Sequence, residues 1–267
     1  MAHSMHFNGV DLSGSSYGLT VLSGPVPFLP GSRVSMKPLG TRPGAYAQGG
    51  YLEQRNIPVN GYVTGSSNAN LKSKLDALRL LLDPANGEQS IRFDHLSDRY
   101  FLGRLSGDMS FDYVGPSSCA VELRFVCADP LGFATSETTQ VVAIDTDPEI
   151  GSVPATGAVA GTAYARPVWK VKNTSGGAVS SIALTNSTTA ESVACTYTVP
   201  NNHWVRFDSQ RERLQYSSND STWTDIMSYL STSAKLFPRL KPGVSNTVVV
   251  QGLTAGELTV VYRARYL

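Results

Sequence analysis

The sequence has few charged residues and almost no net charge. Of its 267 residues, 16% are charged, and 22 basic residues nearly balance 21 acidic ones. This balance does not favour binding to nucleic acid, which selects for a basic surface. The moderate charge also argues against a disordered chain. The 24 glycines, with many serines, threonines and asparagines, are instead typical of short strands joined by turns.

Cysteine is scarce, and long apolar runs are lacking. Cys119, Cys127 and Cys195 are an odd number, and two of them lie in apolar, strand-like contexts, so we expect free, buried thiols. No apolar run approaches the length of a membrane span, and the N-terminus lacks the apolar core of a secretion signal. We therefore expect neither export nor a membrane span, and folding in a reducing cytoplasm.

No convincing catalytic or metal site can be assembled from the sequence. Residues 14–18 have the G-x-S-x-G spacing of a hydrolase nucleophile, but a turn precedes them and a strand follows, where that motif needs a strand and then a helix. Asp94, His95 and Asp98 fit the polar turn of a hairpin, and no further histidine or cysteine cluster completes a zinc site. The sequence therefore predicts no catalytic residue, no metal and no cofactor.

One stretch, from about residue 70 to residue 83, predicts a helix. Its leucines are spaced four, three and four apart: Leu71, Leu75, Leu78 and Leu82. This spacing places them on one helical face. Residues 66–68 offer an N-cap, and Pro84 ends the run. A helix this short is marginal alone in water, so we expect its leucines to pack on a sheet.

Alternating apolar residues predict strands on both sides of the helix. They fall at 57–63, 91–93, 100–105, 109–114 and 121–126. We expect an antiparallel sheet with one helix closing one face. The glycine-rich stretch at 40–50 precedes it and is predicted to be a loop or an arm. The side chains of this region that protein interfaces favour are Arg42, Tyr46, Tyr51 and Arg55.

The second half of the chain predicts a β-sandwich. Its short strands fall at 168–171, 182–184, 193–199, 204–207, 214–216, 247–251 and 258–266. The fold class is thus mainly β, with one domain at 1–134 and a second at 135–267, and residues 145–161 read as a linker or edge loop. Trp204 and Trp223, with Tyr216 and Tyr229, could form a sugar-binding surface. We favour a place in the core, where aromatic residues at alternating strand positions usually lie.

Five segments follow one another along nearly the whole chain. They are 7–12; 38–44 leading into 51–61; 71–82 with 91–94 and 98–101; a strand that ends at 127–130; and 237–246, closing on 260–263. Each is only a turn joined to a strand or helix, and their order and spacing carry the information. In this order they resemble the distal tail proteins of siphovirus-type bacteriophages, the Dit family.

This resemblance implies a structural protein of the virion and not an enzyme. The N-terminal domain would form a six-fold ring, a homohexamer, at the distal end of the tail, with a galectin-like or carbohydrate-module-like C-terminal sandwich facing outward. The implied partners are other copies of the chain, the major tail tube protein, the tail-tip or tail-associated protein, and receptor-binding proteins. Assembly would take place in the host bacterial cytoplasm. The alternative function is a carbohydrate-binding module for host cell-wall sugars.

Overall fold

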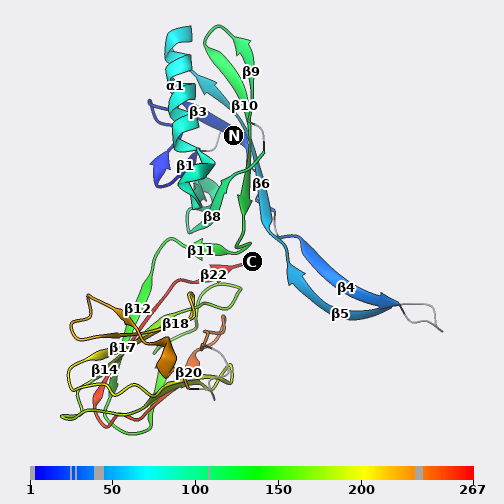
Figure 1. The fold of residues 1–267 in the computed structure, drawn as a ribbon. Helices are drawn as coiled ribbons and strands as arrows, with labels where there is room; N and C mark the ends of the chain where they lie inside the picture. The colour runs from blue at the N-terminus through cyan, green and yellow to red at the C-terminus, as the bar shows by residue number, and fades with distance from the viewer. Residues whose placement is uncertain (1–3, 25, 28, 39–44, 108, 232–236) are drawn as a thin grey trace. The chain divides into compact units, whose positions relative to one another are not determined.

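The computed structural model describes residues 4–24, 26–27, 29–38, 45–107, 109–231 and 237–267 (Figure 1). The chain divides into two compact units, one of residues 1–135 with Leu267 and the other of residues 136–266. The sequence placed the boundary between residues 134 and 135. Over these described residues the structure is mainly β with one α-helix, which confirms the predicted fold class. Among the described residues, no helix has the length and apolar character needed to cross a membrane.

The first unit is built on an antiparallel sheet whose central pair is β6 (Arg55–Thr64) and β10 (Ser118–Cys127). The strand order is β2-β1-β7-β8-β10-β6-β3, and β9 and β11 pair with β10 and β8. The other strands are β1 (Met5–Phe7), β2 (Val10–Asp11), β3 (Leu19–Ser23), β7 (Gln89–Phe93), β8 (Arg99–Leu105), β9 (Ser110–Gly115) and β11 (Gly132–Ala134). Short 3-10 turns lie at Pro84–Asn86 and Asp94–Leu96.

Helix α1 (Asn68–Leu81) covers one face of this sheet, beside β3 and β10 (Figure 1). The side-chain oxygen of Ser67 accepts a hydrogen bond of 3.2 Å from the amide of Asn70 and caps the helix start. The predicted leucine face is buried, in one core with the inward residues of β6 and β10. The predicted helix is therefore confirmed, beginning two residues earlier than expected.

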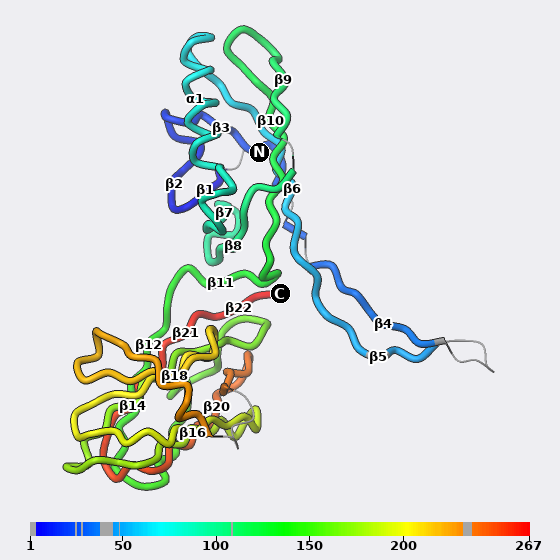
Figure 2. The backbone as a smooth tube through the Cα atoms, viewed as in Figure 1, coloured from blue at the N-terminus to red at the C-terminus, as the bar shows by residue number. Residues whose placement is uncertain are grey.

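Strands β4 (Ser32–Pro38) and β5 (Ala45–Leu52) form a separate two-stranded sheet within the first unit. Figure 2 shows their traces running side by side as a ribbon. The sequence predicted a loop or an arm in this region, and the structure gives a hairpin, called the arm below.

The second unit is a sandwich of two antiparallel sheets. One has the order β12 (Thr138–Ile144), β21 (Gly256–Tyr262), β14 (Val168–Asn173), β17 (Trp204–Asp208), β18 (Arg213–Ser217) and β19 (Thr224–Asp225). The other has the order β13 (Glu149–Val153), β20 (Asn246–Gln251), β15 (Ile182–Asn186) and β16 (Glu191–Cys195). The unit also contains a 3-10 turn at Met227–Tyr229 and the short β22 (Arg265–Tyr266), which belongs to neither of these two sheets. Apolar residues from both sheets meet in a single core.

One expectation for the strands of this unit was wrong. Residues 145–161 are not simply a linker or loop, because β13 lies within them and pairs with β20. The core tryptophan is Trp169, which the sequence did not single out. Its ring is fully buried, and its indole N–H donates to the carbonyl of Pro238 at 3.0 Å and to the Ser209 hydroxyl at 3.2 Å. A buried indole keeps its hydrogen bond in this way.

Candidate functional site

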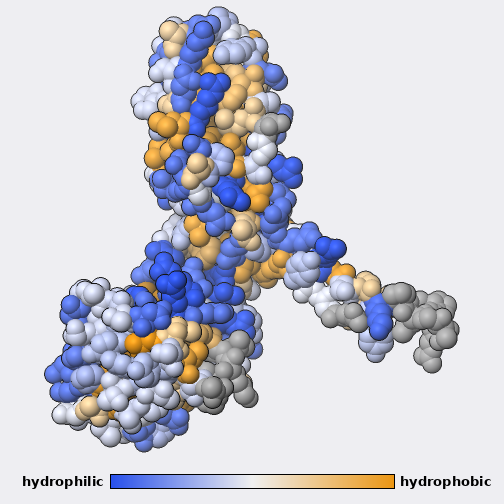
Figure 3. Space-filling view, in the orientation of Figure 1, coloured by the Kyte–Doolittle hydropathy of each residue, from blue (hydrophilic) through white to orange (hydrophobic). Residues whose placement is uncertain are grey.

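The arm carries Tyr46 and Tyr51, two of the predicted interface residues. Every residue of β4 and β5 whose burial is described is exposed, including Tyr46 at 68% and Tyr51 at 59%. Figure 3 shows hydrophobic and hydrophilic residues mixed along the arm. Arg42 lies outside the described residues.

A β-bulge in β5 decides which side chains of the arm share a face. Between Ala47 and Gly49 the register with β4 skips one residue, and Gly49 takes a φ of 136°, a conformation that suits glycine. Without the bulge, Tyr46 and Tyr51 would point to opposite faces, since they are five residues apart. The extra residue brings both rings to the same face.

The arm therefore has two different faces. One carries Tyr46 and Tyr51 with their cross-strand partners Lys37 and Arg33. The other carries Val34, Met36 and Leu52, all exposed, with Met36 at 63%. A two-stranded ribbon is marginally stable alone, and neighbouring exposed apolar side chains are typical of surfaces that another protein covers. The apolar face is suited to contact a second chain.

Arg55 lies at the base of the arm, where β5 leads into β6, but it is only 2% exposed. Its Nε donates to the carbonyl of Pro130 at 2.7 Å, and its Nη1 donates to the carbonyl of Pro27 at 2.5 Å. The guanidinium also lies 5.1 Å from the centre of the Phe101 ring. Burial lowers the pKa of Arg55. This burial does not fit a residue that contacts another subunit. Arg55 instead joins the segment that precedes the arm to the segment that follows β10.

The residues considered for catalysis or metal binding serve local structure. Residues 14–18 form a turn closed by the bond from the Gly18 amide to the Gly14 carbonyl at 2.7 Å. Asp94 and His95 lie in a 3-10 turn between β7 and β8, and Asp98 accepts bonds from Arg99. Within the described part of the chain, no group of three or more His, Cys, Asp or Glu residues could hold a metal ion.

The three cysteines are free and buried, as predicted. Burial raises the pKa of the Cys127 thiol to about 12 and also raises the pKa values of Cys119 and Cys195. Since the thiolate is the reactive form, these groups are chemically inert near neutral pH.

The aromatic residues proposed as either core or sugar-binding surface separate in the structure. Tyr216 packs against the core of the second unit and contacts the ring of Tyr197 at a tilt of 53°, and the Tyr197 ring also contacts Tyr229. Trp204 and Trp223 are partly exposed, and Tyr229 is 44% exposed. All three lie outside the buried core, so the core interpretation was wrong for them. The alternation of β17 explains Trp204, because Val205 and Phe207 point inward and leave Trp204 on the outer face.

The chain is similar to phage tail and baseplate proteins. Residues 12–127 match the family model of the phage tail protein RIFT-related domain. Over 100% of both chains, the structure is similar to that of the Dit protein (gp 19.1) of phage SPP1, with 20% sequence identity and a TM-score of 0.79. That protein is described as a paradigm of the hub adsorption apparatus in phages that infect Gram-positive hosts. No curated protein matches the sequence.

A second similarity is to the activated baseplate of phage P2. The Ca form matches over 98% of both chains with 9% identity and a TM-score of 0.53, and the Sr form over 97% of both chains with 9% identity and a TM-score of 0.52. The resemblance to siphovirus distal tail proteins is thus confirmed, by the family model for residues 12–127 and by the shared fold for the whole chain.

Proposed function

We propose that this chain is a structural hub protein of a phage tail, on the premise that residues 12–127 form a phage tail protein RIFT-related domain and the whole chain has the fold of SPP1 Dit. The observation that carries the proposal is the family match, because it covers the helix, the central strands and the arm together. The role is one of assembly and not of catalysis.

In this proposal the first unit forms a six-fold ring at the distal end of the tail. One side of the ring joins the major tail tube protein, and the other joins the tail-tip, baseplate or receptor-binding proteins. The ring is assembled in the host cytoplasm and becomes part of the virion. Support comes from the similar structures, which are a protein of a phage hub adsorption apparatus and a phage baseplate.

The arm supplies one half of the contact between neighbouring copies. A closed ring of identical subunits needs two complementary surfaces on each subunit, one at each side. The face with Val34, Met36 and Leu52 is exposed and apolar, as a surface buried in such a contact would be. A two-stranded hairpin is also only marginally stable by itself. Each arm therefore packs on the next copy.

Substitutions on the two faces of the arm test this contact. We expect Val34→Ser with Met36→Ser to shift the oligomer toward monomer at micromolar concentration, because the contact loses its apolar surface. Tyr46→Ala with Tyr51→Ala probes the opposite face. Light scattering gives the mass, and circular dichroism checks that the melting temperature is kept, since the arm adds little to the core.

Ile150→Ser is the matched control, because Ile150 is a comparably exposed strand residue of the second unit, 64% exposed. It should leave the mass unchanged. If both arm variants keep the mass of the unsubstituted oligomer, the arm is not the contact between copies.

A further inference from the structure

The outer face of the six-stranded sheet gathers polar and aromatic side chains in two adjacent rows. Register places Thr259, Lys170, Arg206 and Gln215 in one row, and Glu257, Lys172, Trp204 and Ser217 in the next. Inward-facing neighbours such as Trp169, Val171 and Phe207 fill the core. The burial pattern of β14 alternates along its whole length, so the outer rows have no part in the core.

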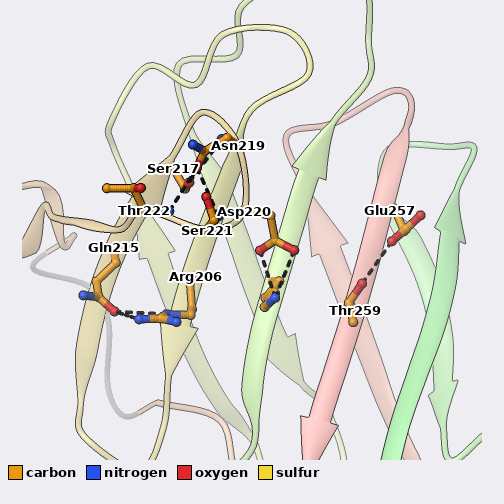
Figure 4. A network of polar contacts seen from close by, with 10 residues as sticks. Arg206, Gln215, Ser217, Asn219, Asp220, Ser221, Thr222, Glu257 and Thr259 are labelled. Atoms are coloured by element: carbon orange, nitrogen blue, oxygen red, sulfur yellow. Dashed lines mark hydrogen bonds and ion pairs between the residues drawn. The ribbon is translucent and has the colours of Figure 1, made fainter.

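The loop of residues 219–223 places a second tryptophan, Trp223, over the row that contains Lys170 and Arg206. Both carboxylate oxygens of Asp220 accept from Lys170 Nζ, at 2.8 and 3.1 Å. The Trp223 ring lies 4.3 Å from the Arg206 guanidinium carbon and 5.7 Å from Lys170 Nζ. Asn219 holds the loop through bonds from the amides of residues 221 and 222 (Figure 4). Trp223 is therefore held in place by a loop with its own hydrogen bonds.

The second row lies beside it and carries groups that remain partly open to solvent. Glu257 is exposed, and Lys172 and Trp204 are partly exposed. Lys172 Nζ lies 4.9 Å from the centre of the Trp204 ring, and Glu257 accepts a bond from the Thr259 hydroxyl at 3.0 Å. Arg206 donates from Nε to Gln215 at 3.0 Å, which orients its planar group. Donors, acceptors and indole rings thus lie together on one face.

This combination matches the chemistry of a sugar ring. A pyranose has an apolar C–H side that can pack on indole, and hydroxyls that need both donors and acceptors such as Lys, Arg, Gln and Glu. A protein-docking centre is depleted of charge, but most side chains in the two rows are charged or polar. A polyanion would need a clear basic excess, whereas here Lys170, Lys172 and Arg206 stand against Asp220 and Glu257.

We propose that this face binds a neutral saccharide chain. A sugar ring stacks on Trp204, Trp223 borders the site, and Lys172 and Glu257 form hydrogen bonds with sugar hydroxyls. This inference goes beyond the hub role, because ring formation by the first unit does not require it. It selects Trp204 and Trp223 from the aromatic residues considered from sequence and leaves out Tyr216, which packs against the core.

Calorimetric titration of the full-length protein with defined oligosaccharides tests the proposal. The neutral probes are chitotetraose, cellotetraose and maltotetraose, and the anionic probe is tetragalacturonate. We expect at least one neutral probe to bind with a Kd below roughly 10 mM and to change tryptophan fluorescence. Trp204→Ala should weaken binding at least about tenfold, Trp204→Phe should weaken it less, and Glu257→Gln should weaken it severalfold.

Ile150→Ser on the other sheet is the control and should bind as the unsubstituted protein does. Circular dichroism confirms folding of each variant, and light scattering should show unchanged mass, so that a failure of sugar binding is distinct from a failure of the ring. The proposal is overturned if no neutral probe binds, if only tetragalacturonate binds, or if folded Trp204→Ala binds as tightly as the unsubstituted protein.

Discussion

Arg55 links the base of the arm to the rest of the first unit through hydrogen bonds. Its guanidinium reaches main-chain carbonyls of Pro27, which precedes the arm, and Pro130, which follows β10. Neither proline lies in a helix or a strand, so no regular hydrogen-bond ladder supplies a donor to its carbonyl, and a charged donor satisfies such an acceptor well. An isolated buried cation is costly, so this placement is stable only with those bonds in place.

Replacing Arg55 should destabilise the first unit. We expect Arg55→Met to lower the free energy of unfolding by about 1–3 kcal/mol, because two carbonyls lose a charged donor while the aliphatic packing is largely kept. Urea denaturation measures the change. The same substitution at Arg33, an exposed residue of the arm, serves as the control and should cost less than about 0.5 kcal/mol. Equal losses at the two positions would show that the Arg55 bonds do not stabilise the unit.

At the scale of an element, helix α1 packs on the sheet through one face only. Leu78 is 1% exposed and faces the sheet, whereas Leu80, two residues further along, is 77% exposed. The two have the same helix propensity because they are the same residue, so any difference between them comes from burial.

Truncating these two leucines separates packing from propensity. Leu78→Ala should cost about 2–5 kcal/mol of unfolding free energy, since it leaves a cavity between the helix and the sheet. Leu80→Ala should change stability by less than about 0.5 kcal/mol. Both are measured by urea denaturation. A loss below half a kcal/mol for Leu78→Ala would mean that this helix face is not in the core.

The elements differ in how far the sequence could predict them. The leucine period was sufficient for α1, and alternation was sufficient for most strands. The alternation in β17 was enough to place Trp204 outside the core, because Val205 and Phe207 face inward and Trp204 must then face outward. The assumption that large aromatics are buried overrode that signal. Strand β13 was missed because its stretch is rich in Gly, Pro and Ala, and its pairing with β20 is a long-range contact.

The faces of the arm and the burial of Arg55 could not be predicted from the sequence, because both depend on contacts between segments that are distant in the chain. A bulge is visible only in the pairing of two strands, so the positions of Tyr46 and Tyr51 along the sequence do not reveal that they share a face. Likewise, arginine is usually exposed, and only the carbonyls of two distant segments explain its burial at position 55.

At the scale of the whole molecule, the proposed function depends on the assembly of several copies. Residues 12–127 of the first unit match the family model of a phage tail protein domain, and the arm exposes an apolar face that a neighbouring copy can cover. A hub role further requires that several copies close on themselves, because an open chain of copies would not end a tail in a defined tip.

The most direct test is the mass of the purified full-length protein by light scattering across a concentration series, with the same samples viewed by negative-stain microscopy. The account predicts rings with a central opening and a mass of about 170 kDa, six times the 28.6 kDa of one chain. A chain that stays at 28.6 kDa at every concentration, or forms open filaments, would contradict a self-assembling six-fold ring.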